Sequence, residues 1–570
     1  MSAAAGWEER REAGQFQPDN LQATNSFLDQ PIGLYPTATT NEEIYDTDGY
    51  VEFFVPLVED VPFMEKLSLD IGGRYSVFSN GIPDAKTFKL NPDWAVTKSF
   101  RIRGGYNHAV RAPNLGELYL GEQEYFGGGA VFGDPCSLRS TAPFGAGGAA
   151  PDFSASGSGG IGAGVPTKLA SGQTAAGAES TYLICQAQMG GTVPQAATTP
   201  TGPYMAGTGG AGYYYGTTGN QATGAAAAVF AWLNEEGNAN LQSETANTWT
   251  AGFVFSNLGD NPWIRGLSGS VDWWQIDIDH AIELTSPDEA NYFCYGTVTV
   301  TTAAQAAAQA ATTACQNVAR NLTTGGTTTA LLQYNNLATI GIQGIDLQAN
   351  WLTPLEDIGL KVPGAVTFST QDTILDYYKT KASPYDFDVD TNWKGSQGPV
   401  LADTNPGAFA YRLNAQIGYV LPSWSVNFGW RFLPSVNSVS KAEQDAIIAN
   451  NEHVLSTGKG TLLSWIPDNT EAAPSWEEFT LTGTWTVNKI LQIRGGIDNL
   501  FNKDPAITGQ TAGYPTGKGL TTYCTAAMTK LGCVNPSAYV IPNDGVGQTN
   551  PALGYDIYGR TFFLGVKASF

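Results

Sequence analysis

Residues 411–432 read YRLNAQIGYVLPSWSVNFGWRF, and this stretch decides the fold class. Every second residue from Tyr411 to Leu421 is apolar or aromatic, and polar residues or glycine occupy most of the positions between them. The same alternation runs from Trp424 to Phe432. A period of two predicts β-strands with two different faces, and the Pro-Ser pair between the runs predicts a tight hairpin. Runs of about nine residues or more have the length of strands that cross a membrane.

Fourteen segments show this alternation, and each predicts a strand. Leu67–Val77 and Phe479–Val487 are clear examples. Soluble strands average about 5–6 residues, and these runs are about twice as long, which favours a transmembrane barrel over a soluble β-sandwich. The segments lie near residues 5–12, 48–57, 67–78, 86–96, 99–110, 243–257, 266–280, 338–353, 362–376, 408–421, 424–434, 475–487, 490–501 and 557–570.

The connections between these segments alternate in length. Six of the short ones are 58–66, 97–98, 258–265, 354–361, 422–423 and 488–489, and each follows an even-numbered segment. Those after odd-numbered segments are long except for 79–85, and span 13–47, 111–242, 281–337, 377–407, 435–474 and 502–556. Short periplasmic turns on one rim and long extracellular loops on the other are typical of outer-membrane barrels. We therefore expect an all-β, antiparallel transmembrane barrel wall.

Composition agrees with this class. Charged residues make up 14% of the chain, against about 25% in ordinary soluble domains. The chain has 52 acidic and 29 basic residues, a formal charge of −23, so no clustered basic surface is expected to bind nucleic acid. No apolar run is long enough for a transmembrane helix. Met1–Gly14 lacks the pattern of a secretory signal, so either the barrel interpretation is wrong or the chain is a fragment.

All six cysteines fall in long loops, two in each of three loops. Local pairs are the simplest of the possible pairings, and disulfides fit an oxidising exterior. No CxxC spacing occurs, so a zinc site is not expected. The expected pairs are Cys136 with Cys185, Cys294 with Cys315, and Cys524 with Cys533.

The loop at 111–242 is rich in Gly, Ala, Ser and Thr, and we expect most of it to be a flexible surface loop. Tyr213, Tyr214 and Tyr215 form an aromatic group within it that is a candidate ligand contact. The Ala-rich stretch 303–319 predicts a short helix, and Ser440 with Glu443 predicts the start of another.

Catalytic chemistry is not indicated. Asp277 and Asp279 alternate with isoleucines, so both carboxylates are expected to face a polar lumen, where acidic groups are ordinary. Asp388, Asp390 and Asn392 match half of a calcium loop that lacks its glycine and closing glutamate. We therefore predict no enzyme activity, no metal site and no cofactor.

Three short motifs resemble those of TonB-dependent outer-membrane receptors. Arg111-Ala112-Pro113-Asn114 with Glu117-Leu118 resembles the family's R-A-P-N-x-x-E-L signature. Asn499-Leu500-Phe501-Asn502 with Pro505 resembles its N-L-F-[DN]-x-x-P element, and Tyr558-Gly559-Arg560 leading to Phe570 is similar to its carboxy-terminal strand. The terminal Phe570 also resembles the signal that barrel-insertion machinery recognises.

The resemblance implies a 22-stranded barrel, plugged by an N-terminal domain, that imports a scarce nutrient with energy relayed by TonB. The signal peptide, TonB box, plug and first strands have no counterpart here, so residues 1–570 are expected to be the carboxy-terminal two-thirds of such a barrel. The implied location is the outer membrane of a Gram-negative bacterium, and the implied partners are outer-membrane lipid, the insertion machinery and TonB through the missing plug. The ligand class stays open between siderophore, cobalamin, saccharide and peptide.

Lumen-facing arginines are further candidate contacts. Arg412, Arg431 and Arg494 are expected to steer an anionic ligand or, equally, to pair with Glu478 and Asp498 across strands. Two other functions remain as alternatives. One is a self-contained 14-stranded passive porin or fatty-acid channel, against which the charge-rich first strand counts. The other is a soluble glycan-binding β-protein.

Overall fold

The computed structural model describes most of the chain. The described residues are 1–19, 37–79, 81–127, 134–136, 142–146, 169, 172–189, 204–207, 213–217, 231–320, 327–388, 390–399, 407–437, 441–457, 465, 471–505, 507–508, 524–533, 548–549 and 554–569. Phe570, expected to end the last strand, lies outside them.

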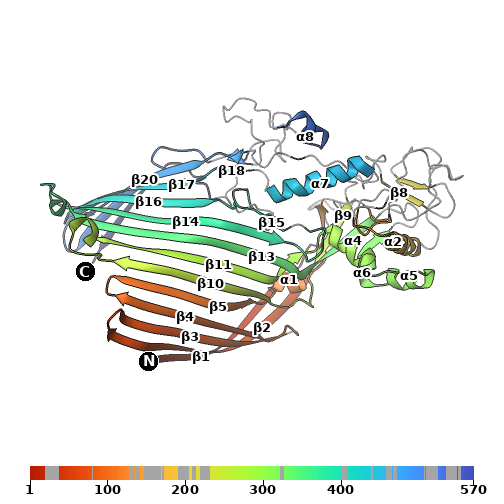
Figure 1. Cartoon of the computed structure of the whole chain (residues 1–570), viewed down its shortest axis with the longest axis horizontal. Coiled ribbons are helices and arrows are strands. Elements are labelled where there is room, and N and C mark those ends of the chain that lie inside the picture. The colour runs from red at the N-terminus through yellow and green to blue at the C-terminus, as the bar shows by residue number, and fades with distance from the viewer. Residues whose placement is uncertain are drawn as a thin grey trace.

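Fourteen long strands form an antiparallel array within an 18-stranded sheet, and each of them pairs with the next long strand along the chain (Figure 1). All fourteen expected segments are strands, so the predicted fold class is confirmed. The strands are β1 Ser2–Phe16, β2 Thr40–Val61, β3 Met64–Phe78, β4 Ala85–Thr97, β5 Phe100–Arg111, β10 Glu244–Ser256, β11 Leu267–Leu284, β13 Thr327–Pro354, β14 Ala365–Lys381, β16 Tyr411–Val420, β17 Trp424–Leu433, β20 Trp476–Thr486, β21 Leu491–Asp498 and β24 Thr561–Ala568.

The sheet is curved but not closed. β1 pairs with β2 and β24 pairs with β21, and within the described residues no ladder joins β1 to β24. Both edges therefore carry backbone groups without a strand partner in the described part of the chain.

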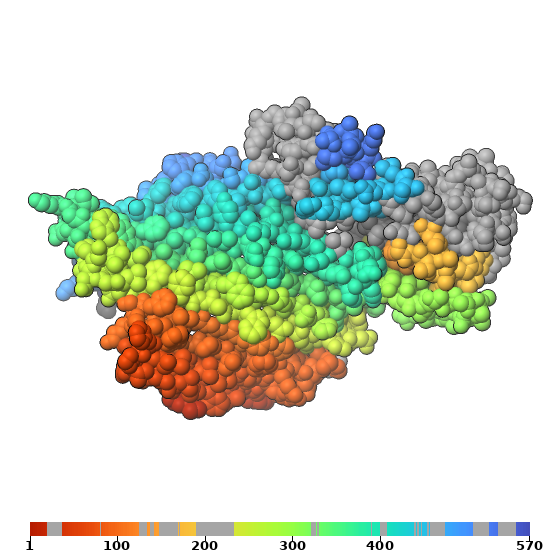
Figure 2. Space-filling view, in the orientation of Figure 1, coloured from red at the N-terminus to blue at the C-terminus, as the bar shows by residue number. Residues whose placement is uncertain are grey.

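Long and short connections lie at opposite ends of the strands (Figure 1). The short turns gather at one end, where the amide of Ser569 also donates to the carbonyl of Ile490 at the β20–β21 turn. Most of the helices gather beyond the other end, and the space-filling view shows this part projecting past the strands (Figure 2). The exceptions, Pro262–Arg265 and Leu355–Ile358, lie in the short turns. The predicted sorting of loops by length is confirmed.

Alternation along the strands gives the sheet two faces. The apolar face carries exposed large side chains, including Ile71, Trp249 and Ile417. On this face the Tyr106 and Trp249 rings lie 4.4 Å apart across β5 and β10. The charged face carries ion pairs between strands that are adjacent or one strand apart. This two-faced pattern is the one expected for a wall between lipid and a polar lumen.

Helices and short strands occur in the connections. No described helix is long and apolar enough to cross a membrane. The helices are α1 Leu115–Tyr119, α2 Ala175–Gln188, α3 Pro262–Arg265, α4 Pro287–Tyr295, α5 Ala303–Ala310, α6 Thr313–Gln316, the 3-10 helix η3 Leu355–Ile358, α7 Lys441–Thr457 and α8 Ala526–Lys530. The short strands are β6 Gln123–Gly127, β7 Tyr204–Gly207, β8 Tyr213–Thr217, β9 Ala231–Glu236, β12 Val318–Arg320, β15 Thr391–Asn392, β18 Val436–Asn437, β19 Glu471–Ala473, β22 Ile507–Thr508 and β23 Gln548–Thr549.

The loop helices agree in part with expectation. The Ala-rich stretch forms two short helices, α5 and α6, rather than one. The helix expected after Ser440 is α7, although Ser440 itself lies outside the described residues. The 111–242 loop, expected to be mostly flexible, contains α2, whose N-cap Thr174 accepts a hydrogen bond from the amide of Gly177.

Candidate functional site

A ladder of ion pairs runs along the charged face of the N-terminal strands. Lys89 of β4 is the clearest member, because its Nζ lies 2.8 Å from both Glu52 of β2 and Asp70 of β3. Most of these groups are partly exposed, so each pair adds little stability but fixes a side chain in place. The other pairs are Arg10–Asp46, Arg74–Asp48, Arg74–Glu8, Arg101–Asp93 and Arg103–Asp272.

Two hollows lie along this ladder. One, of about 520 Å³, is lined by Asp48, Arg74 and Lys89. The other, of about 930 Å³, is lined by Arg103, Asp272 and Trp274 among others. Both are open and carry charged side chains of both signs, which suits a solvated passage more than a tight pocket.

Besides the sheet, parts of the long loops form a folded unit of their own. We call residues 134–136, 142–146, 172–189 and 285–320 the loop cap. It has its own buried core, in which Ile184 and Cys294 are fully buried. Disulfides join Cys136 to Cys185 and Cys294 to Cys315, and a third joins Cys524 to Cys533 outside the cap. The structure thus contains the three local pairs.

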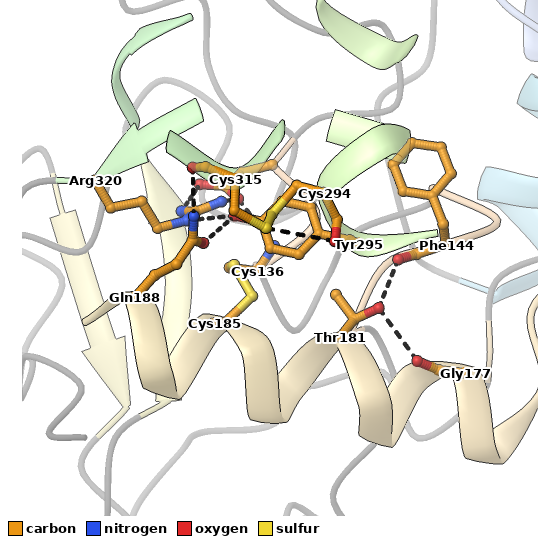
Figure 3. Close-up of a disulfide and its surroundings, with 11 residues drawn as sticks. Cys136, Phe144, Gly177, Thr181, Cys185, Gln188, Cys294, Tyr295, Cys315 and Arg320 are labelled. Atoms are coloured by element: carbon orange, nitrogen blue, oxygen red, sulfur yellow. Dashed lines mark hydrogen bonds and ion pairs between the residues drawn. A yellow bond between two sulfur atoms is a disulfide. The ribbon is translucent and has the colours of Figure 1, made fainter. Parts of the chain in front are cut away.

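A buried ion pair joins two parts of the loop cap, and Figure 3 shows its arginine, Arg320, beside Tyr295 and Gln188. Nη2 of Arg320 lies 2.5 Å from Oδ1 of Asp134, and the Arg320 side chain is fully buried. Nε of Arg320 donates to the Tyr295 hydroxyl at 2.9 Å, and that hydroxyl donates to Gln188. Gln188 in turn donates from Nε2 to the carbonyl of Cys315 at 2.9 Å. The network connects α2, α4 and β12, elements from two different long loops.

An aromatic pocket of about 450 Å³ opens where three loops meet. Phe144 comes from the 111–242 loop, Tyr292 from the 281–337 loop, and Tyr385 and Phe387 from the 377–407 loop. The rings contact one another, with centroids 4.3 Å apart for Tyr292 and Tyr385. We call this cavity the aromatic pocket.

A buried carboxyl group lies on α4, the helix that carries Tyr292 of the aromatic pocket. Glu289 is 2% exposed and closes a capping box with Ser286 at the start of α4. Its Oε2 accepts from the Ser286 amide at 2.7 Å, whereas Oε1 is buried without a hydrogen-bond partner among the described residues. Burial raises the pKa of Glu289 to about 7, and the charge of Asp388 acts in the same direction.

The Arg111–Glu117 motif connects the end of β5 to α1 and to the neighbouring strand β10 through hydrogen bonds and ion pairs. Asn114 is the N-cap of α1, and its side chain accepts from the amide of Glu117 at 2.9 Å. Glu117 accepts from the Asn114 amide at 2.8 Å and from Arg111 Nη1 at 2.9 Å. Arg111 also reaches Glu244 of the neighbouring strand β10 at 2.6 Å. Pro113 immediately precedes the cap and is buried.

The Asn499–Pro505 motif is a structural turn. Asn499 is fully buried with a φ of +49°, and its side chain bonds both the amide and the carbonyl of Lys503, at 2.6 and 2.8 Å. The amide of Leu500 donates to the carbonyl of Phe479 at 2.6 Å. Phe501 is 65% exposed, and its ring lies 5.3 Å from that of Phe479. The motif therefore ends β21 and holds the loop that follows, and Pro505 lies in that loop.

The three predicted arginines all lie on the charged face, but the structure brings only two of them to the same end. Arg412 and Arg431 lie towards the loop end of β16 and β17, where they donate to the carbonyls of Gly407 at 3.3 Å and Gly554 at 2.7 Å. Arg431 is directly opposite Glu478 in the β17–β20 register. Arg494 is near the start of β21, close to the turn end.

The tyrosines Tyr213, Tyr214 and Tyr215 lie in β8, which pairs with β7 in a two-stranded sheet. This sheet is separate from the large one.

The expected direction of Asp277 and Asp279 is wrong. The β10–β11 register is regular, so Asp277 and Asp279 share the face of Trp273, opposite to the face of Asp272. Asp272 pairs with Arg103 on the charged face. The physical reason is that the isoleucines beside them are not on the apolar face: Ile276 lines the larger hollow on the charged side.

The sequence carries little local signal for several of the site residues. Asp134, Arg320 and Glu289 occupy unremarkable positions in long loops, and only the Ser286–Glu289 capping-box spacing was a signal that could have been seen. Among the described residues no group of three or more His, Cys, Asp or Glu side chains is placed to hold a metal ion.

The family model "TonB dependent receptor-like, beta-barrel" matches residues 4–157 and 194–500. The chain belongs to this family. The match covers the strands from β1 to β21 and most of the loop cap, and the family is one of receptors and transporters rather than enzymes. No curated protein matches the chain.

Solved structures similar to this chain include two siderophore receptors and a copper transporter. A mutant of the ferric enterobactin receptor PfeA from Pseudomonas aeruginosa has 13% identity and a TM-score of 0.48, over 99% of this chain and 50% of that one. The siderophore receptor PirA from Acinetobacter baumannii has 12% identity and a TM-score of 0.46, over 100% and 52%. The copper transporter OprC has 12% identity and a TM-score of 0.42, over 100% and 53%. The chain spans about half the length of these structures.

Proposed function

We propose that this chain is the wall and loop region of an outer-membrane receptor that takes up a scarce nutrient with energy relayed by TonB in a Gram-negative bacterium. Family membership supports the class of protein. The observation that carries the proposal is the two-faced, fourteen-stranded sheet with its long loops at one end. In this arrangement the apolar face contacts lipid, the charged face lines the lumen, and the loop cap lies outside the cell.

The proposal assigns a path to the ligand. The loops at 111–242, 281–337 and 502–556 form the outer mouth, and Tyr213–Tyr215 are proposed contacts there. Arg412, Arg431 and Arg494 are proposed contacts along the lumen. We further propose that TonB acts through a plug domain that the 570 residues do not include, and that the last strand is read by the barrel-insertion machinery.

Transport of this kind changes no bond in the ligand, so the protein needs no catalytic group. The ion ladder supports this role, because its charges pair with each other and leave a solvated, polar wall along which a ligand passes.

Uptake by cells tests the proposal. The complete gene would be expressed in cells with and without functional TonB, and accumulation of labelled ferric siderophore, cobalamin, maltodextrin and dipeptide would be measured. Accumulation of one of them that requires TonB supports the proposal. Equal accumulation with and without TonB indicates a passive channel, and recovery of the protein in the soluble fraction rejects a membrane function.

A further inference from the structure

The aromatic pocket has the composition of a ligand site. Its lining combines the rings of Tyr292, Tyr385 and Phe387 with hydroxyl and amide groups, and its volume of about 450 Å³ lies in the usual range of ligand pockets, about 300–1,000 Å³. The rings of Tyr385 and Phe387 are stacked, with centroids 5.6 Å apart and planes 23° apart, and both residues are half-buried. Such a pair presents a flat, partly accessible apolar surface.

Charge at the pocket is of one sign. Asp386 is the one charged side chain in the described lining, and it is exposed. Glu289 and Asp388 lie nearby, and their charges add to the effect of burial, the largest cause, in raising the pKa of Tyr385. An anionic ligand would therefore be repelled at this pocket.

The pocket is held in shape by the loop cap. Thr181 of α2 donates to the carbonyl of Phe144 at 2.8 Å, and the Cys136–Cys185 disulfide ties α2 to the segment that precedes Phe144 (Figure 3). Tyr292 lies on α4, which the Cys294–Cys315 disulfide ties to α6. A pocket whose walls are cross-linked loses little entropy when a ligand binds.

We propose that the aromatic pocket binds a neutral carbohydrate. A sugar ring has one face rich in C–H groups, which would pack on Tyr385 and Phe387, and a rim of hydroxyl groups, which would donate to the carboxylate of Asp386. Tyrosine suits this task because it offers an apolar ring together with a polar hydroxyl. The inference rests on the proposed function only in placing the pocket outside the cell, where it would be the first contact of the ligand.

Binding to the 570-residue chain in detergent tests the inference without transport. Maltose, cellobiose and lactose would be titrated by saturation-transfer NMR and calorimetry, with citrate and choline as charged controls. We expect at least one disaccharide to bind with a dissociation constant of about 1 mM or below, which is ordinary for weak sites. Tyr385→Ala should weaken that binding about tenfold, the loss of one ring contact. Asp386→Asn, an exposed substitution of nearly equal size, should weaken that binding by a similar factor.

Tyr182→Ala is the matched control, since Tyr182 lies on α2 in the loop cap but does not line the pocket. It should bind the disaccharide as the parent chain does. The inference is overturned if no disaccharide binds, if citrate or choline binds in place of the sugars, or if Asp386→Asn binds as tightly as the parent. Failure of TonB-dependent uptake with intact sugar binding would reject the transport proposal and leave the pocket assignment standing.

Discussion

The carboxylate of Asp134 and the guanidinium of Arg320 form an ion pair between residues 186 positions apart, and neither side chain is more than 5% exposed. The pair joins the segment beside Cys136 to β12 and so closes the loop cap on itself. Burying two charges is costly, but removing one partner of such a pair is costlier, because the other charge stays buried and unpaired.

Asp134→Asn should therefore destabilise the loop cap by about 3–5 kcal/mol while the sheet stays folded. Hydrogen exchange of the α2 and α4 amides measures the loss, and the strand amides serve as the internal reference. Asp445→Asn breaks the exposed Lys441–Asp445 pair of α7 and should change local stability by less than about 1 kcal/mol. Equal effects of the two substitutions would contradict the account of the buried pair.

Acidification should stabilise the loop cap through Glu289. Its pKa is about 7 in the folded chain against an ordinary value of 4.5, so the folded cap binds a proton that the unfolded cap releases over this range. The stabilisation is full below about pH 4.5 and is lost as the pH rises to about 7, with an upper limit of about 3 kcal/mol. Hydrogen exchange of α4 at pH 5 and pH 8 would show it.

Glu289→Gln keeps an acceptor for the Ser286 amide but removes the titration. Exchange in this variant should vary less between the two pH values, after correction for intrinsic exchange, and the cap should be more stable than the parent at pH 8. A parent chain whose α4 is equally protected at both pH values would show that Glu289 is ionised when folded.

Glu117 has two roles at the rim, and two substitutions separate them. Glu117→Gln keeps a capping acceptor for the Asn114 amide and loses the charge that pairs with Arg111, so we expect a change of less than about 1 kcal/mol. Glu117→Ala loses both and should cost about 1 kcal/mol more. Exchange of the α1 amides and of the β5–β10 ladder measures both. Equal exchange in Glu117→Gln and Glu117→Ala would mean that the capping contact adds no stability.

The membrane assignment of the two faces makes a prediction about adjacent residues on β16. Ile417 is 52% exposed on the apolar face, opposite Phe368 and Phe428, and Gln416 points to the charged face. Ile417→Arg should cost about 2–4 kcal/mol in lipid, because it places a charge against hydrocarbon. Gln416→Arg should reduce the free energy of unfolding far less, because this side chain lies on the charged face. Urea titration of the two variants folded into lipid vesicles compares their free energies of unfolding. A larger loss for Gln416→Arg than for Ile417→Arg would reject the assignment of the faces.

The strands of the large sheet could be predicted from the sequence because the side-chain pattern of a membrane strand is local. Each residue faces either lipid or lumen, so the alternation at 411–432 fixed the strands, their faces and the turn between them. The same rule failed at Asp277, where Ile276 faces a hollow on the charged side and the apolar face carries acidic residues.

The structure of the loop cap could not be predicted in the same way. Its contacts join residues as distant as Asp134 and Arg320, and a Gly- and Ala-rich composition gives no sign of which small residues, such as Ala178, are packed in a core. The cysteines were the exception, because two in each loop indicated the pairs. The aromatic pocket depends on three loops that meet only in space, so no local pattern marked it.

Each disulfide begins and ends within one connection between strands, with separations of 49, 21 and 9 residues. No covalent bond of this kind ties one loop to another or to the sheet among the described residues. A reducing agent would therefore remove the covalent cross-links within the loops, while backbone ladders keep the strands in register. Under the proposed function, ligand binding by the loops could then be weakened while the strands stay in the membrane.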